Sequence, residues 1–237
     1  MIYFAEKKKR LLGAMAFVIF CFVISIFMKT DDIIKPTSFI QSSAAIDKQD
    51  MGNEKKVAIT FDDGPNIDYT GKLLKGLKER GVCATFFLLG SEIEKYPELV
   101  QQMYEDGHLI GTHSYQHVNL CNLTDEAAIE QIVKTNELLK EITGEIPLFI
   151  RPPFGCWRKD LDYETKMIEV LWDIDPLDWC TNNTGIIVNR VLKEVEDGDI
   201  ILLHDASQSS VEAALQIIDQ LLKDGYVFVT VEELLLN

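Results

Sequence analysis

Basic residues are scarce in this chain outside its N-terminus. Of the 23 lysines and arginines, five lie in residues 1–29 together with one acidic residue, so residues 30–237 carry 18 basic and 37 acidic side chains, a formal charge of −19. Nucleic acids and anionic lipids bind proteins through basic patches, which an acidic surface does not offer. We therefore expect no nucleic-acid partner.

Cysteine is also scarce, and no two of the five cysteines have Cys-x-x-Cys spacing. A metal cluster held by cysteines is therefore not expected. Cys21 lies in an apolar run, and Cys83 begins an apolar strand, where a small hydrophobic residue fits. Cys121, Cys156 and Cys180 each follow a predicted strand, and whether any of the cysteines form disulfides is left open by the sequence.

The N-terminus combines a basic segment with a long uncharged run. Residues 1–10 end in Lys7-Lys8-Lys9-Arg10, and residues 11–28 contain no charge. This run is short for a membrane span, long for a signal-peptide core, and not followed directly by a small-x-small cleavage site. We expect a single-pass transmembrane signal-anchor over 11–28 with residues 1–10 in the cytoplasm, a linker over 29–54 and an extracytoplasmic domain over 55–237. Cleavage of the segment, giving a secreted protein, is the alternative.

From residue 55 onward, strand-like and helix-like segments alternate. Apolar, β-prone runs lie at 57–61, 84–89, 108–112, 148–151, 169–174, 199–203 and 226–230. Amphipathic stretches of helical length lie at 68–80, 92–106, 125–141, 185–196 and 210–224, with a weaker candidate at 158–168. Strands that alternate with helices predict parallel pairing with the helices outside. About seven such units favour a distorted (β/α) barrel over an open sheet.

Two adjacent carboxylates, Asp62 and Asp63, stand where the first strand meets Gly64-Pro65. A Gly-Pro pair ends regular structure. Because successive strand residues face opposite ways, the two carboxylates cannot share one task unless the turn re-aims one of them. An Asx-type turn would explain the pattern if it stood alone, so a functional interpretation depends on the other strand ends.

In a closed α/β barrel, chemistry belongs at the C-terminal ends of the strands. Three of the four histidines, His113, His117 and His204, follow predicted strands; His108 begins one, and we assign it only a structural role. His113 and His117 are four residues apart, so on one helical turn they could share a metal with a nearby carboxylate. Taken singly, none of these residues requires a functional role, since surface helices produce the same spacing by chance and His204 could be a core histidine.

Five ordered motifs carry a family resemblance: Thr60–Pro65, His113–His117, Arg151–Gly155, Asp175–Trp179 and Leu202–His204. Together they resemble the polysaccharide deacetylase family, the NodB homology domain or carbohydrate esterase family 4. The resemblance covers roughly residues 55–237. Phe154 stands where the family more often has tyrosine, and Ser114 where threonine is commoner. Neither departure changes the expected reaction, because the family uses that aromatic residue chiefly through its backbone amide.

The resemblance implies a divalent metal, with zinc favoured, held by Asp63, His113 and His117. It also implies that Asp62 is the general base for the attacking water. Arg151 would pair with Asp62 and keep it ionised and oriented. Without the other motifs, Arg151 could simply cap a strand end.

The remaining motif residues would complete the site by the same resemblance. The backbone N–H of Phe154 would meet the oxyanion, and His204 would protonate the departing amine while Asp178 holds its imidazole charged. Trp179 and Leu202 would form the wall of a pocket for the acetyl methyl group. Both are also typical core residues.

These expectations amount to a membrane-anchored, metal-dependent N-deacetylase of an extracytoplasmic N-acetylated glycan, for which peptidoglycan N-acetylglucosamine is the favoured substrate. A chito-oligosaccharide deacetylase or an acetylxylan esterase would use the same residues. A catalytically silent glycan-binding domain is the alternative from another class, and loss of a motif residue would indicate it.

Overall fold

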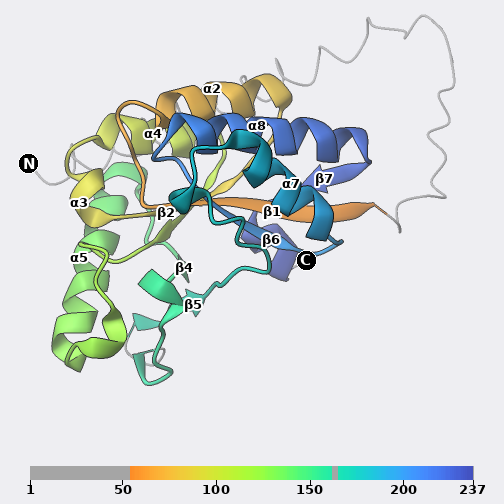
Figure 1. The fold of residues 1–237 in the computed structure, drawn as a ribbon. Helices are drawn as coiled ribbons and strands as arrows, with labels where there is room; N and C mark the ends of the chain where they lie inside the picture. Colours follow the sequence, from red (N-terminus) through yellow and green to blue (C-terminus); the bar gives the residue numbers. More distant parts are fainter. Residues whose placement is uncertain (1–53, 162–164, 237) are drawn as a thin grey trace, which may run out of the picture. The chain divides into compact units, whose positions relative to one another are not determined.

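The computed structural model describes residues 54–161 and 165–236 (Figure 1). The predicted anchor over 11–28 and the predicted linker up to residue 53 lie outside the described residues. Among the described helices, none has both the length and the hydrophobicity that a membrane span requires.

All seven described strands pair in parallel, as the alternation of strands and helices predicts. They are β1 (Lys55–Asp62), β2 (Thr85–Leu88), β3 (Leu109–Thr112), β4 (Phe149–Ile150), β5 (Ile168–Glu169), β6 (Ile200–His204) and β7 (Tyr226–Phe228). Their order in the sheet is β5-β4-β3-β2-β1-β6. Strand β1 has three partners: β6 pairs along one side of it, while on the other side its first residues pair with β7 and its last residues with β2.

The segment that follows β4 closes the sheet into a distorted barrel. Ile168 and Glu169 pair with β4 at one edge, and Ile174 forms a parallel bridge with Ile201 of β6 at the other edge. One short stretch of backbone therefore contacts both edges of the sheet. This arrangement fits the predicted distorted (β/α) barrel.

The prediction of one continuous strand over 169–174 is wrong, because a side chain takes the place of a neighbouring strand. Arg151 donates from Nε to the carbonyl oxygen of Val170 (3.2 Å) and from Nη2 to that of Leu171 (3.0 Å). Its guanidinium carbon lies 4.3 Å from the ring centroid of Phe87. The carbonyl groups that would extend the ladder are thus satisfied by a guanidinium inside the barrel.

Helices pack against the strands (Figure 1), most of them on the outer face of the sheet. They are α2 (Thr70–Arg80), α3 (Gly90–Ile93), α4 (Pro97–Glu105), α5 (Asp125–Thr143), α7 (Thr184–Glu194), α8 (Gln208–Lys223) and α9 (Val231–Leu236). The prediction of one helix over 92–106 is wrong: Pro97 lacks a backbone N–H and starts a new helix instead of continuing α3. The helix predicted over 158–168 includes residues 162–164, which lie outside the described residues, and its last residue belongs to β5.

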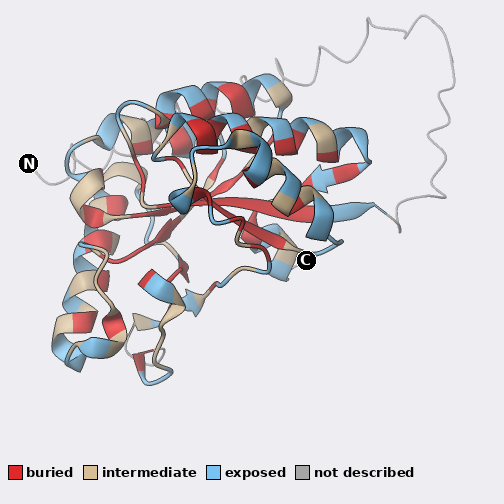
Figure 2. Cartoon of the chain, viewed as in Figure 1, coloured by how far each residue is buried: buried red, intermediate tan, exposed pale blue. Residues whose placement is uncertain are grey.

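From Val57 onward β1 is buried (Figure 2), and its side chains alternate between two environments. Val57, Ile59 and Phe61 pack in the large apolar cluster that β1 shares with α2, α4, α7 and α8, whereas Ala58 packs in a second cluster on the opposite, inner face of the sheet. Asp62 is on the same face of the strand as Ala58. Apolar packing therefore fixes β1 so that a carboxylate points into the barrel mouth.

Gly111 in β3 tests how tightly that interior is packed. A Cβ there would lie 2.6 Å from a ring carbon of Phe87 and 2.9 Å from the carbonyl oxygen of Phe149. We expect Gly111→Ala to lower the free energy of unfolding by about 1–3 kcal/mol, measured by urea denaturation, because neither neighbour has room to move. Gly71→Ala is the matched control, since nothing lies within 4 Å of a Cβ at that helical position. It should leave the stability unchanged or raise it, and equal losses in the two variants would contradict the packing argument.

Candidate active site

The end of β1 is held by an ion pair inside the barrel. Nη1 of Arg151 lies 2.8 Å from Oδ1 of Asp62 and 2.6 Å from the hydroxyl of Thr60. Arg151 is completely buried and Asp62 is 3% exposed. A buried charge is tolerated only when it is paired and hydrogen-bonded, and this guanidinium has the carboxylate, the hydroxyl and two carbonyl groups as partners. The network fixes the orientation of the Asp62 carboxylate.

Asp63 is turned towards the same space by its backbone. Its φ is +71°, in the left-handed region that few residues with a side chain adopt. The next residue, Gly64, approaches Asp205 so closely that a Cβ would lie 2.8 Å from a carboxylate oxygen. The turn therefore re-aims the second carboxylate, which allows Asp62 and Asp63 to serve one site.

Asp205 is buried behind this turn, and the sequence predicted no role for it. It accepts a hydrogen bond from the hydroxyl of Thr70, which in turn accepts one from the backbone N–H of Asn66 (2.6 Å). Burial raises the pKa of Asp205 to about 6. This chain of contacts ties the turn after β1 to the start of α2.

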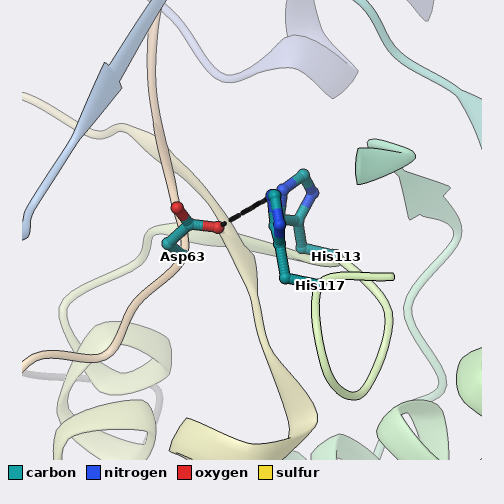
Figure 3. A group of neighbouring side chains, drawn as sticks. All are labelled: Asp63, His113 and His117. Carbon is teal, nitrogen blue, oxygen red and sulfur yellow. Dashed lines mark ion pairs between the residues drawn. The ribbon is translucent and has the colours of Figure 1, made fainter. Parts of the chain in front are cut away.

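His113 and His117 follow β3 and face Asp63 (Figure 3). In each histidine Nε2 lies 3.5 Å from Oδ1 of Asp63. Nδ1 of His113 is 2.6 Å from the carbonyl oxygen of Arg151, to which it donates, so its Nε2 presents a lone pair to Asp63. Burial lowers the pKa of His113 more than the nearby carboxylates raise it. The neutral imidazole that results is the form that ligates metal ions.

The expectation that the two histidines share a helical turn is wrong. They lie in an irregular loop, in which Ser114 and His117 have φ values of +67° and +54°. The carbonyl groups of Ser114 and Tyr115 accept hydrogen bonds from the backbone at the start of α3 instead of from a helical turn of their own. The loop nevertheless brings the two imidazoles together.

The residues around Asp63 fit a divalent cation. One ligand atom each from Asp63, His113 and His117 lie within 4.8 Å of one another. Oδ1 of Asp63 is buried and has no hydrogen-bond partner among the described residues, although such an atom is costly to leave unpaired. Two imidazole nitrogens and one carboxylate oxygen are a ligand set that suits zinc and leaves further positions open.

His204, at the end of β6, is paired with a buried carboxylate. Its Nδ1 lies 2.8 Å from Oδ1 of Asp178, and its backbone N–H donates to Oδ2 of the same residue. Burial opposes a charge on this imidazole, but the hydrogen bond and charge of Asp178, with the charges of Asp62 and Asp63, raise its pKa to about 9. Nε2 of His204 lies 4.0 Å from Oδ2 of Asp63, so the free nitrogen faces the other motif residues.

A cavity of about 480 Å³ joins these groups. It is lined by Asp62, Asp63, His113, His117, Pro152, Phe154, Trp172, Asp175, Trp179, Leu202 and His204. Leu202 is buried, whereas Phe154 and Trp179 are about two-thirds exposed, so Trp179 is not a core residue. Trp172 and Asp175 were not proposed as site residues: Trp172 lies in a run predicted as an apolar strand, and Asp175 was noted only as part of a motif.

Four cysteines and the fourth histidine, His108, remain to be placed in the structure. Cys121 and Cys156 form a disulfide, which the sequence had left open, and Cys83 and Cys180 are free thiols. His108 is buried and accepts a hydrogen bond at Nδ1 from the backbone N–H of Ala84, and burial lowers its pKa to about 4. These contacts agree with a structural role for His108.

We expect one divalent ion per chain at Asp63, His113 and His117. Elemental analysis of the purified protein should show that His113→Ala and His117→Ala both lose the metal, because each removes one of the three ligand atoms. His108→Ala, which removes a histidine away from the cavity, should retain it. Full occupancy in either of the first two variants would exclude that histidine from the ligand set.

Comparisons with known proteins agree with the site. A family model described as polysaccharide deacetylase matches residues 49–170. The peptidoglycan-N-acetylmuramic acid deacetylase PdaC of Bacillus subtilis is 42% identical over 182 residues, which cover 77% of this chain and 39% of that protein. A peptidoglycan-N-acetylglucosamine deacetylase of Bacillus cereus is 41% identical over 185 residues, 75% of this chain and 67% of that protein. The match to PdaC thus spans about two-fifths of that relative's length.

Solved structures show the same fold. The structure of PdaC has a TM-score of 0.75 at 42% identity, covering 77% of this chain and 90% of the chain solved. A pseudoenzyme of the CE4 family from Bacillus anthracis has a TM-score of 0.72 at 28% identity, covering 77% and 66%. The fold alone therefore does not decide between active and inactive proteins.

Proposed function

The chain belongs to the polysaccharide deacetylase family, and on this premise we propose that it hydrolyses N-acetyl groups of a peptidoglycan outside the cytoplasm, releasing acetate. The observation that carries the proposal is that one cavity is lined by Asp62, by the three candidate metal ligands and by His204, which Asp178 holds from behind. A base, a set of metal ligands and a charged acid are what hydrolysis of an amide requires.

N-acetylglucosamine is the favoured sugar. The curated relatives named above act on peptidoglycan, one on N-acetylmuramic acid and one on N-acetylglucosamine by their names. Apart from His204 and the residues of the proposed metal site, the described residues that line the cavity include Asp175 and no lysine or arginine. Such a lining favours a neutral sugar over one that carries a carboxylate.

Asp62 is the proposed general base. Its Oδ1 is occupied by Arg151, whereas Oδ2 lies 3.8 Å from Nε2 of His113 and so faces the ligand group. A divalent cation held by Asp63, His113 and His117 would polarise the amide carbonyl and lower the pKa of bound water. Asp62 would accept the proton of the attacking water, with Arg151 keeping the carboxylate in place.

Three other residues would act on the carbonyl end of the substrate. The backbone N–H of Phe154 would donate to the oxyanion, in a loop whose direction is set by the left-handed conformation of this residue (φ +61°). Trp179 and Leu202 would enclose the acetyl methyl group, since both line the cavity. Together they would orient the amide towards Asp62.

His204 is the proposed general acid for the leaving amine. An amine leaves badly unless it is protonated as the C–N bond breaks, so the acid must carry a proton at the working pH. The pKa of about 9 that Asp178 helps to maintain meets this need. The imidazole would give its Nε2 proton to the sugar nitrogen.

The cellular location is a further part of the proposal. The Cys121–Cys156 disulfide is typical of proteins in oxidising compartments. With the apolar run over 11–28, it supports a domain outside the cytoplasm that is tethered to the membrane by its N-terminus.

Acetate release is the direct test. The purified full-length chain should release acetate from peptidoglycan faster than from chitin oligomers or acetylxylan. Preference for chitin oligomers or acetylxylan would instead support the related esterase and deacetylase activities that use the same residues. A metal-loaded protein that binds the glycans but releases no acetate would be a silent binding domain.

The two adjacent aspartates have different expected roles. Asp62→Asn should retain the metal and lose turnover, because the base is removed while the ligands stay. Asp63→Asn should weaken metal binding as well, since an amide is a poorer ligand than a carboxylate. Metal content and acetate release measured on the same preparations separate the two, and equal metal affinity in both variants would refute this division.

The pH dependence of the rate tests the acid. With a pKa of about 9, His204 is charged below that pH, so the wild-type rate should fall as the pH rises through about 9. Asp178→Asn removes the hydrogen-bonded carboxylate that contributes most to raising the pKa of His204, so it should move this alkaline limb to lower pH. Asp224→Asn, at the far end of α8, should leave the limb in place. His204→Ala should reduce the rate by roughly 10²–10⁴-fold at unchanged metal content. An alkaline limb at the same pH in Asp178→Asn and the wild type would contradict the proposed His204–Asp178 pair.

A further inference from the structure

The disulfide joins two loops that both contribute to the site. We name residues 113–122, which hold His113 and His117, the histidine loop, and residues 152–158, which hold Phe154, the phenylalanine loop. Cys121 lies four residues after His117, and Cys156 two residues after Phe154. Their Cα atoms are 6.0 Å apart, although 35 residues separate them in the sequence.

Each loop contains a residue in an unfavourable backbone conformation. His117 and Phe154 have φ values of +54° and +61°. Non-glycine residues keep such conformations only where the surrounding structure imposes them. The two residues also touch each other, because their ring centroids are 4.7 Å apart in an edge-to-face arrangement. A shift of one loop would therefore move both a metal ligand and the residue whose amide meets the oxyanion.

Apolar packing also joins the two loops, because Leu120 of the histidine loop and Trp157 of the phenylalanine loop lie in one cluster. The polar links, which are made with residues that directly follow the histidine loop, are weak. Arg158 donates to Oδ1 of Asp125 (2.6 Å) and, with a longer bond, to the carbonyl oxygen of Leu123 (3.4 Å). The Asp125 side chain is 60% exposed, and ion pairs of this kind contribute little in water. The aromatic contact itself is made by a phenylalanine side chain that is mostly in solvent. The covalent bond is the strongest link between the two loops.

We propose that the Cys121–Cys156 disulfide is a positioning element that holds the histidine loop and the phenylalanine loop in register, so that the deacetylase activity depends on the redox state of this pair. The catalytic part of the inference rests on the proposed function, whereas the effect on His117 does not. Reduction by a dithiol would transfer two electrons and two protons to the pair, break the S–S bond and form two thiols, while the dithiol becomes a disulfide. The reduced protein keeps its barrel but loses the alignment of the two loops.

The test compares the full-length wild type with the double variant Cys121→Ser/Cys156→Ser. We expect kcat to fall by roughly 10–100-fold, since misplacement of a reacting group by about 1 Å has effects of this order. KM should change little, because the contact of the Phe154 amide with the oxyanion forms only in the transition state. The dissociation constant for zinc should rise by about 10–100-fold, as it does when groups that orient a ligand are removed.

Two controls separate positioning from a general loss of stability. Leu221→Ala removes a buried side chain at the far end of α8 and should lower the melting temperature without changing kcat or the zinc affinity. Cys83→Ser removes a thiol away from the two loops and should behave as the wild type. A double variant that merely melts at a lower temperature, with wild-type kcat and zinc affinity, would overturn the proposal.

Reduction of the folded wild type provides an independent route if the double variant does not fold. Treatment with a phosphine should expose two additional thiols per chain and lower kcat and zinc affinity to the values of the double variant. Reoxidation should restore both. Unchanged zinc affinity after both thiols appear would refute the positioning role. An oxidised protein that binds zinc tightly but releases no acetate from any glycan would refute the proposed function instead, and the zinc measurement would still test the loops.

Discussion

The buried ion pair between Arg151 and Asp62 is the constraint on which the site depends. A guanidinium in an apolar interior must find a partner for its charge and for its N–H groups. Here the partners come from two distant parts of the chain: the end of β1, and the carbonyl groups of Val170 and Leu171. The same side chain thus orients a carboxylate, ends β5 after two residues and sets the path of the segment that closes the barrel.

The rest of the site is assembled by turns rather than by regular elements. Asp63, Ser114, His117 and Phe154 all have positive φ, and all lie just after the strand ends that the sequence marks as polar. The strands bring these residues to one rim, but the left-handed turns aim them into one cavity. The regular core supplies the rigidity that such strained positions require.

The sequence predicted the alternation of strands and helices because each kind of element has its own apolar periodicity, which can be read directly from the sequence. It also identified the motif residues, since their types and order carry the family resemblance. It did not predict the break at Pro97 as a helix start, the short β5 or the irregular path of the histidine loop. The last two depend on contacts between distant segments, such as those of the carbonyl groups of Ser114 and Tyr115 with the start of α3, and no local pattern encodes them.

The position of β1 between its parallel neighbours has a mechanical consequence. This strand begins at Lys55, runs between β6 on one side and β7 followed by β2 on the other, and ends at the carboxylate that Arg151 holds. A pull on the chain ahead of Lys55 acts along the axis of β1, so the bonds to its parallel neighbours are loaded together in shear rather than opened one after another. The element that bears such a load ends in Asp62 and leads directly into Asp63. The same eight residues of β1 therefore both resist a pull on the chain and orient the Asp62 carboxylate.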